Sequence, residues 1–408
     1  MSNFKLRDYQ KNNAKECTEI ILKYGLVYLQ HEVRCGKTLT ALQIAKNVNA
    51  KKILFLTKKK AIESILSDYR NFNFTFDIEV INYESLHKVT FKPDLIVCDE
   101  ASTLGAYPKP SKRTKLIKLK YSNLPIIFLS GTPATESYSQ WFHQFWVSKK
   151  SPFRNYVNFY KWAKDFTTEA FIYTNYGQAK DYSKAKIKEI DNVIFNVVHK
   201  FTQKKAGFVN KLNKQIHYVT LKNSTYKVIN KLKKDRVVEG KNEVILADTA
   251  VKLMSKEHQL GSGSIIFESG KSAILDNTKA IFIKDNFKNK KLAILYYFKE
   301  ELQMLLDTFG DDCTTDLNEF NITDKHYLGQ QYSSAMGVNL SKADCLVYLN
   351  FGFSGTNYHQ SLDRLTIKTR EITDIHFIIA KNTIDYKIWQ TIEQKNNFTK
   401  KIYEQISN

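Results

Sequence analysis

The chain has 408 residues, of which 43% are hydrophobic and 25% are charged, the balance of a globular protein large enough for two domains. No apolar run approaches the roughly 18 residues that a membrane span needs, and the N-terminus has no signal-peptide pattern, so we expect a cytoplasmic protein with no membrane partner. The net charge of +21, from 62 Lys and Arg against 41 Asp and Glu, favours a polyanionic partner such as nucleic acid.

The first part of the chain alternates short apolar runs with helical patterns. Residues Thr38–Val48 carry apolar side chains at helical spacing. The apolar runs are continuous rather than alternating, as in parallel strands that are covered by helices on both faces. This rhythm predicts a doubly wound α/β sheet. The expected strands are Lys52–Thr57, Glu79–Asn82, Leu95–Cys98 and Ile126–Ser130.

Helical patterns then replace the strand patterns, and a second alternating block follows. Strand patterns return near Leu292, at Cys345–Leu349 and at His376–Ala380. We therefore predict two α/β domains, residues 1–225 with a helical insertion at about 138–188, and residues 259–408, joined by a helical bridge at 226–258. The aromatic side chains of the insertion have a helical spacing that favours core packing over base stacking: Trp141, Phe145, Trp146, Tyr156, Phe159, Tyr160 and Trp162.

Two residue types bear on the kind of site that the chain carries. The five cysteines are scattered, and neither cysteines nor histidines form a set at ligand spacing, so we expect reduced thiols and no zinc site. Arginine occurs at only eight positions, so an ordinary positive charge in this chain is a lysine. Arginine offers a planar fork that lysine lacks, which gives weight to the arginines inside motifs.

The triplet Gly36-Lys37-Thr38 lies between an expected strand and an expected helix. A phosphate loop has this setting because backbone N–H groups and the helix N-terminus face the phosphates. Lys37 would reach the β- and γ-phosphates, and the Thr38 hydroxyl would bind Mg²⁺. The full GxxxxGK[ST] pattern is not met, because His31 occupies the position of its first glycine.

The acidic pair Asp99-Glu100 follows an apolar strand at its C-terminal end, where ligands bind in open α/β sheets. Asp99 would hold Mg²⁺ through water, and Glu100 would orient and deprotonate an attacking water. Acidic pairs after strands are also common as solvated loop starts. The pair comes some sixty residues after the GKT triplet, with strands in between, so the two signals support each other.

Further segments stand in the order of the motifs of superfamily 2 helicases, and the chain resembles the Swi/Snf-type translocase branch in the compact form typical of phage-encoded members. The resemblance implies two RecA-like domains with parallel sheets, ATP and Mg²⁺ in the cleft between them, and hydrolysis that moves the protein along nucleic acid. The segments that carry it are LRDYQ, VRCGKT, FLTKKK, INYESL, CDEAS, LSGTPATES, LAILYYFKEELQMLLDTF, SSAMGVNL, YHQSLDR and NTIDYKIWQTIEQK.

The resemblance also implies roles for the residues at matching positions. In the nucleotide site these are Arg7, Gln10, Arg34, Cys35, Gly36, Lys37, Thr38, Asp99, Gly337, Asn339 and Gln360, with Thr38 and Asp99 on Mg²⁺. Ser130, Gly131 and Thr132 would couple the nucleotide state to nucleic acid, and Lys58, Asn82, Tyr83 and Ser333 would contact the polymer. Glu100 and Arg364 would be catalytic.

Three positions depart from the pattern of that branch. Arg34 replaces a loop glycine, Ser102 replaces the histidine of motif II, and Ile367 stands where a second arginine of motif VI is expected. We assign the missing catalytic arginine to Arg370, because its fork suits a phosphate, with Lys368 as the nearer cation. The alternative is that Arg370 pairs with a surface acid and that Arg364 acts without it.

The sequence therefore predicts a nucleic-acid-dependent ATPase, an ATP-driven motor that acts as a monomer on duplex or branched DNA rather than RNA. Two alternatives stay open. One is a helicase that separates the strands of DNA or RNA. The other is a nucleic-acid-binding protein that keeps the fold without turnover, which Arg34 and Ile367 would allow.

Overall fold

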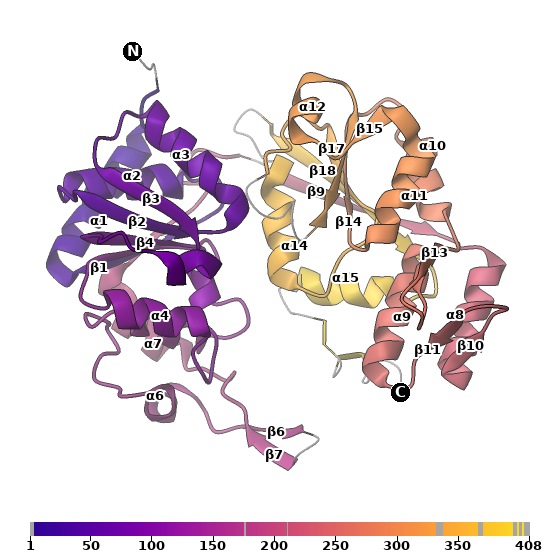
Figure 1. Cartoon of the computed structure of the whole chain (residues 1–408), viewed down its shortest axis with the longest axis horizontal. Helices are drawn as coiled ribbons and strands as arrows, with labels where there is room; N and C mark the ends of the chain where they lie inside the picture. Colours follow the sequence, from indigo (N-terminus) through magenta and orange to yellow (C-terminus); the bar gives the residue numbers. More distant parts are fainter. Residues whose placement is uncertain are drawn as a thin grey trace. The chain divides into compact units, whose positions relative to one another are not determined.

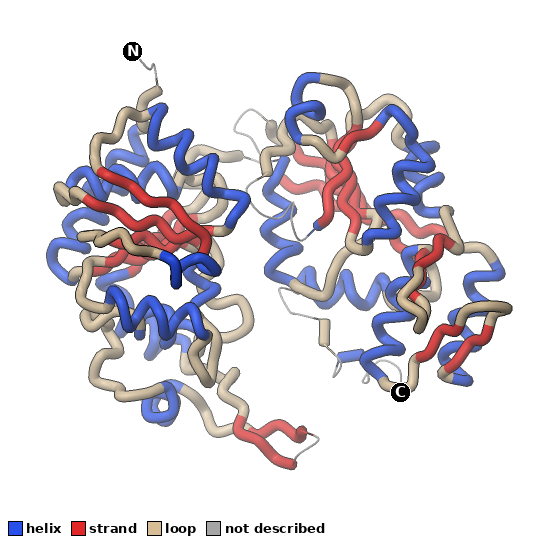
Figure 2. The backbone as a smooth tube through the Cα atoms, viewed as in Figure 1, coloured by secondary structure: helices blue, strands red, loops and turns tan. Residues whose placement is uncertain are grey.

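The computed structural model describes residues 4–174, 177–209, 211–331, 338–365, 370–394, 398–399 and 402–403. The chain divides into two compact units, Met1–Phe208 and Val209–Asn408, and each is built around a twisted sheet with helices against it (Figures 1 and 2). Among the described residues, no helix is both long enough and apolar enough to cross a bilayer.

The first unit contains a six-stranded sheet of order β3-β2-β4-β5-β1-β8, in which every pairing is parallel. A small antiparallel hairpin, β6-β7, stands apart from this sheet. The strands are β1 Leu26–His31, β2 Lys52–Thr57, β3 Asp77–Asn82, β4 Leu95–Asp99, β5 Ile126–Leu129, β6 Phe171–Thr174, β7 Gly177–Lys180 and β8 Val198–Phe201. The helices are α1 Asp8–Tyr24, α2 Lys37–Asn47, α3 Ile62–Asn71, α4 Lys112–Tyr121, α5 Gln140–Trp146, α6 Phe159–Phe166 and α7 Ile187–Ile194, with short 3-10 helices η1 Lys59–Ala61, η2 Tyr83–Lys88, η3 Ala101–Leu104 and η4 Phe195–Val197.

The second unit also contains an all-parallel six-stranded sheet, of order β15-β16-β14-β17-β18-β9. Two antiparallel hairpins, β10-β11 and β12-β13, accompany it. The strands are β9 Lys211–Val219, β10 Val237–Glu239, β11 Val244–Leu246, β12 Ser264–Ile266, β13 Ser272–Ile274, β14 Leu292–Tyr296, β15 Cys313–Thr314, β16 His326–Gln330, β17 Cys345–Tyr348 and β18 Ile372–Ala380. The helices are α8 Asn223–Asp235, α9 Ala250–Ser262, α10 Thr278–Asn286, α11 Lys299–Phe309, α12 Leu317–Ile322, α14 Gly355–Leu362 and α15 Asp385–Glu393, with 3-10 helices η5 Gly310–Asp312 and η6 Asp363–Leu365.

The continuous apolar runs have a direct explanation in the two faces of each sheet. Successive side chains of a strand point to opposite faces, and here both faces are packed. In β2, Leu54 and Leu56 join one buried cluster, whereas Ile53 and Phe55 join another. The α/β fold class with two RecA-like, parallel-sheet units is therefore confirmed.

The boundaries of the two units differ from those predicted from the sequence. The units divide between Phe208 and Val209, not near residue 225, because β9 pairs with β18 along its whole length in the second sheet. The expected bridge at 226–258 is part of the second unit, since α8 and α9 contribute Leu232 and Leu253 to its core. The insertion at 138–188 contains the hairpin β6-β7 in addition to helices. The aromatic prediction is confirmed for the buried members Trp141, Phe145, Phe159 and Trp162, whereas Tyr160 is 44% exposed.

Candidate active site

The predicted motifs of the first unit meet at the carboxyl edge of its sheet. Strands β4, β5 and β1 are neighbours and run parallel, so their C-terminal ends lie at one edge. The loop after β1 leads to Lys37, β4 ends at Asp99, and β5 is followed by Ser130 and Gly131. This is the edge at which open α/β sheets bind ligands.

The loop between β1 and α2, predicted to bind phosphates, contains two residues in the left-handed backbone region. Arg34 and Gly36 have φ values of 63° and 74°, in the left-handed region, and Gly36 is the N-cap of α2. A Cβ atom on Gly36 would lie 2.1 Å from the Gln10 amide nitrogen, so a larger residue there would have to displace the Gln10 side chain. Gln10 of the adenine motif thus lies against the loop, and the N–H groups of the first turn of α2, including Thr38, face the same edge.

Lys37 is held by the loop that precedes it. Its ammonium Nζ donates hydrogen bonds to the carbonyl oxygens of His31, at 3.0 Å, and Glu32, at 3.2 Å. Gly131 lies on the other side of this contact, because a Cβ atom there would be 3.1 Å from the His31 carbonyl oxygen and 3.7 Å from Lys37 Nζ. The glycine of motif III therefore lets the two loops approach each other.

Motif III also has an internal contact. The buried Ser130 hydroxyl accepts a hydrogen bond of 3.2 Å from the backbone N–H of Thr132, which shapes the turn around Gly131. The three residues predicted to couple nucleotide state to nucleic acid thus form one short turn beside the phosphate loop.

Asp99 is fixed at both its side chain and its backbone. Its Oδ2 accepts a hydrogen bond of 2.7 Å from the Thr57 hydroxyl, and its carbonyl oxygen accepts one of 2.6 Å from the Tyr83 hydroxyl. Loss of water and the neighbouring Glu100 carboxylate raise the pKa of Asp99 to about 6, against the lowering effect of Thr57 and Lys37. Glu100 has φ 48°, which is uncommon for a residue with a side chain and is typical of functional sites.

The segment predicted to recognise adenine lies at the start of α1. The Gln10 side-chain oxygen accepts a hydrogen bond of 2.9 Å from the Arg7 backbone N–H, which caps the helix. The Arg7 guanidinium donates to the Tyr9 hydroxyl at 2.8 Å, and the Tyr9 ring stacks on Phe201 with centroids 5.3 Å apart. Arg7 is exposed and Gln10 is buried.

The residues predicted to contact nucleic acid differ in their burial and in their hydrogen bonds. Lys58 is the N-cap of η1 and is half-buried, and the Asn82 amide donates to a Glu84 carboxylate oxygen at 3.2 Å. Tyr83 is only 3% exposed, and its hydroxyl is used to hold Asp99. The expectation that Tyr83 contacts the polymer therefore disagrees with its burial, and its position favours a supporting role for motif II.

Three of the described site residues predicted in the second unit lie on α14, in η6 and in the segment before β17. Gln360, on α14, is buried, and the Arg364 carbonyl oxygen in η6 accepts a hydrogen bond of 3.1 Å from the Leu340 N–H. Asn339 is exposed, and its side-chain oxygen accepts from the Ser341 N–H at 3.2 Å. Ser333, Gly337, Ile367 and Lys368 lie outside the described residues.

Arg370, which the sequence assigns as the missing catalytic arginine, has its guanidinium bound to backbone carbonyl groups in the structure. Its guanidinium donates to the carbonyl oxygens of Ala343 at 2.8 Å, Ser341 at 3.2 Å and Leu365 at 3.4 Å. Among the described residues, no Asp or Glu carboxylate forms an ion pair with Arg370, so the surface ion pair considered as the alternative is not seen there. This geometry favours a role in tying together the segments on either side of β17.

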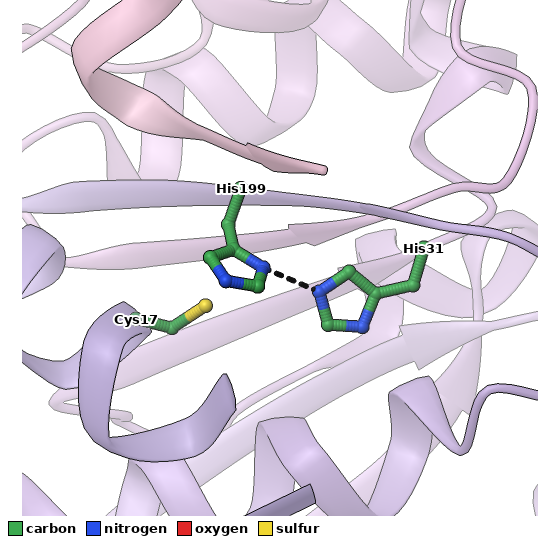
Figure 3. Close-up of side chains that lie close together, drawn as sticks. All are labelled: Cys17, His31 and His199. Carbon is green, nitrogen blue, oxygen red and sulfur yellow. Dashed lines mark hydrogen bonds between the residues drawn. The ribbon is translucent and has the colours of Figure 1, made fainter. Parts of the chain in front are cut away.

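The fold also assembles a cluster that the sequence did not indicate. His31 Nε2 and His199 Nδ1 are 2.8 Å apart, and His199 Nε2 is 2.8 Å from a Glu16 carboxylate oxygen. Figure 3 shows the Cys17 side chain beside the two rings. The Cys17, His31 and His199 ligand atoms lie within 4.8 Å of one another. Because 168 residues separate the two histidines, no local spacing could have revealed the cluster.

The cluster has the geometry of a hydrogen-bonded chain rather than of a zinc site. Two nitrogens that share a tetrahedral zinc lie about 3.3 Å apart, as follows from Zn–N bonds of about 2.0–2.1 Å. The observed 2.8 Å is the length of a direct hydrogen bond between the rings. Burial, His199 and Lys37 lower the pKa of His31 to about 2, so His31 is neutral and serves as a fixed partner beside the phosphate loop.

The first prediction concerns the carboxyl of Asp99. Thr57→Val removes a hydrogen bond that stabilises the ionised form, so the pKa of Asp99 should rise above about 6. Because the pKa of Asp99 in the folded protein, about 6, lies above the ordinary value of an aspartate, ionisation of Asp99 destabilises the folded state increasingly as the pH rises from that ordinary value to about 6. Carboxyl ¹³C NMR titration measures the shift. Thr167→Val is the control, and an unchanged Asp99 titration in Thr57→Val would contradict the assignment.

The second prediction concerns Arg370. Arg370→Ala should lower the free energy of unfolding of the second unit by about 1–3 kcal/mol, because three carbonyl groups lose a charged donor. Urea unfolding followed by circular dichroism, with hydrogen exchange at residues 341–345, measures the loss. Normal stability together with lost hydrolysis at saturating ATP would instead support the catalytic role.

Comparisons with known proteins found similarity to solved structures only. No protein-family model and no curated protein matches the chain. The chain is similar to the Sulfolobus solfataricus SWI2/SNF2 ATPase core in complex with dsDNA, with 16% identity, a TM-score of 0.43, and coverage of 99% of this chain and 93% of that chain. It is also similar to the Sulfolobus solfataricus SWI2/SNF2 ATPase core domain, with 15% identity, a TM-score of 0.43, and coverage of 96% and 89%.

Proposed function

We propose that the chain is an ATP-dependent motor that moves along duplex DNA, with its hydrolytic centre at the carboxyl edge of the first sheet. The observation that carries the proposal is the meeting of three motifs there. The Lys37 ammonium contacts the loop after β1, Gly131 lies against the same loop, and Asp99-Glu100 ends the strand next to β5. The compact, phage-like form of the Swi/Snf-type branch stays a sequence-based prediction.

The residues at this edge have the chemistry that phosphoryl transfer needs. The N-terminus of α2 offers N–H groups to phosphate oxygens, and Lys37 would exchange its two carbonyl partners for the β- and γ-phosphates. The Thr38 hydroxyl and the Asp99 carboxylate are oxygen donors of the kind that Mg²⁺ prefers, and the bound ion would neutralise phosphate charge. Glu100 would accept a proton from the attacking water as the bond to the leaving ADP breaks.

The proposal that the chain moves along DNA rests on its positive charge and on the motif resemblance. The excess of 62 basic over 41 acidic residues supports binding to a phosphate backbone. Lys58 and Asn82 stand at the C-terminal ends of β2 and β3, on the sheet that carries the hydrolytic centre. In the second unit, Arg364 is the proposed catalytic arginine. Contacts to backbone phosphates would give affinity that depends little on base sequence.

The third prediction tests the hydrolytic centre. Lys37→Ala should weaken nucleotide binding, and Glu100→Gln should bind ATP without cleaving it, because only the second variant keeps the phosphate contacts. Each should lower the hydrolysis rate by at least about a hundredfold. Nucleotide titration and phosphate release measure the two effects. Near-normal turnover in either variant would refute the site.

The fourth prediction tests the track and separates the motor from its rivals. Hydrolysis should be stimulated most by duplex DNA in a series of no polymer, single-stranded DNA, duplex DNA, forked DNA and RNA. Binding should weaken steeply with salt, because phosphate neutralisation releases counterions. ATP should drive triplex displacement with little unwinding of a plain duplex.

Each rival gives a different outcome in the same assays. Unwinding of a tailed duplex without triplex displacement would favour a strand-separating helicase. Salt-dependent binding with no hydrolysis on any polymer would favour a non-catalytic binding protein.

A further inference from the structure

The segment that ends the first unit lies against the phosphate loop. It comprises residues 201–208 and begins at the last residue of edge strand β8, and we call it the strap. Strand β8 pairs in parallel with β1, the strand that leads into the loop. The strap ends at Phe208, and the next residue, Val209, belongs to the second unit.

Polar contacts join the strap to two consecutive residues of the loop. The Glu32 N–H donates to the Phe201 carbonyl oxygen at 2.9 Å, and the Glu32 carboxylate accepts from the Gln203 backbone N–H at 2.6 Å. The Gln203 side-chain amide donates to the Val33 carbonyl oxygen at 3.0 Å. Gln203 therefore binds the loop with both its backbone and its side chain.

An apolar contact joins the strap to the next part of the loop. Cys35 is fully buried and packs in a small cluster with Phe201, Ala206 and Phe208, with Tyr9 at its margin. This cluster is separate from the two large clusters that pack on the faces of the sheet. Its members come from the loop, the strap and the start of α1, so its packing depends on the strap.

The contacts lead from the strap to the phosphate-binding lysine. The strap holds Glu32, and His199 of β8 is hydrogen-bonded to His31. The carbonyl oxygens of His31 and Glu32 are the two acceptors of the Lys37 ammonium. The strap and its strand thus fix the two residues from which Lys37 is held.

The loop needs such support because of its composition. A glycine adopts the left-handed conformation without strain, but Arg34 has φ 63° and carries a side chain. Strained residues of this kind persist only where their surroundings hold them. His31, at the position of the first glycine of the usual pattern, is likewise held by a side-chain contact from outside the loop.

We propose that Gln203 is a positioning residue for nucleotide binding: with Glu32 it holds the phosphate loop in its binding shape, a role that glycines have in an ordinary phosphate loop. The proposal rests on the proposed function, since it assumes that ATP binds at this loop. Gln203 acts through the loop and touches no phosphate. Its loss should therefore weaken ATP binding more than it slows the chemical step.

The test compares the full-length protein with Gln203→Ala. The dissociation constant for ATP, measured without polymer, and the KM should both rise by about tenfold, the effect of losing one well-placed hydrogen bond to a loop that must stay ordered. The kcat at saturating ATP should fall by less than about threefold. Lys204→Ala, an exposed neighbour in the same strap, is the matched control and should bind ATP like the parent.

A second pair of variants tests the contact from the loop side. Glu32→Ala should weaken ATP binding as Gln203→Ala does, whereas Glu32→Gln keeps a side-chain oxygen that can accept from the Gln203 N–H and should restore most of the affinity. Thermal unfolding of each variant checks that the fold is kept. A merely structural role would lower stability without this rescue and without the separation of KM from kcat.

The outcomes separate this proposal from the one on which it rests. If the parent protein binds no ATP, the proposed function fails. If the parent binds ATP and Lys37→Ala weakens it, but Gln203→Ala binds as the parent does, the role of the strap alone is refuted. A fall in kcat with an unchanged KM in Gln203→Ala would also refute the positioning role.

Discussion

The parallel pairing of β1 with a neighbour on each side is the constraint on which the candidate site depends. Strand β5 on one side leads to Gly131, and β8 on the other leads to the strap, so the loop after β1 is held between two segments. Because parallel strands end at one edge, residues far apart in the chain meet without any local signal between them. The loop, which departs from the usual glycine pattern, is therefore held by contacts from both neighbouring segments.

The acidic part of the candidate site is also held by contacts from several elements. Asp99 is desolvated next to Glu100, and both effects raise its pKa, while Thr57 and Lys37 oppose them. Tyr83 fixes the backbone of the same residue from a buried position. A carboxylate in such a balance responds strongly to a nearby cation, because a positive charge favours its ionised form. In the proposed site, a bound Mg²⁺ would therefore favour the ionised form of Asp99.

Several parts of the fold and the site were predictable from local sequence. The buried strands β2, β4, β5, β14 and β17 follow from continuous apolar runs, and the position of the GKT triplet follows from the strand and helix around it. Other parts were not predictable. Strand β9 alternates between exposed and half-buried residues at the edge of the second sheet, so it lacks the apolar run by which strands such as β2 and β14 were found. Tyr83 and Arg370 lie in or near motifs, yet burial and carbonyl contacts decide what each can do.

The sequence by itself determined the α/β class, the two parallel-sheet units and the residue types available for phosphate chemistry, because apolar runs and strand–loop–helix patterns are local properties. Only the tertiary structure decided which residues support the phosphate loop. Gln203 and His199 have no motif around them, and they reach the loop after β1 and its neighbouring residue His31 because edge strand β8 pairs with β1. Strand order is a long-range outcome of packing, so contacts made across it cannot be read from spacing along the chain.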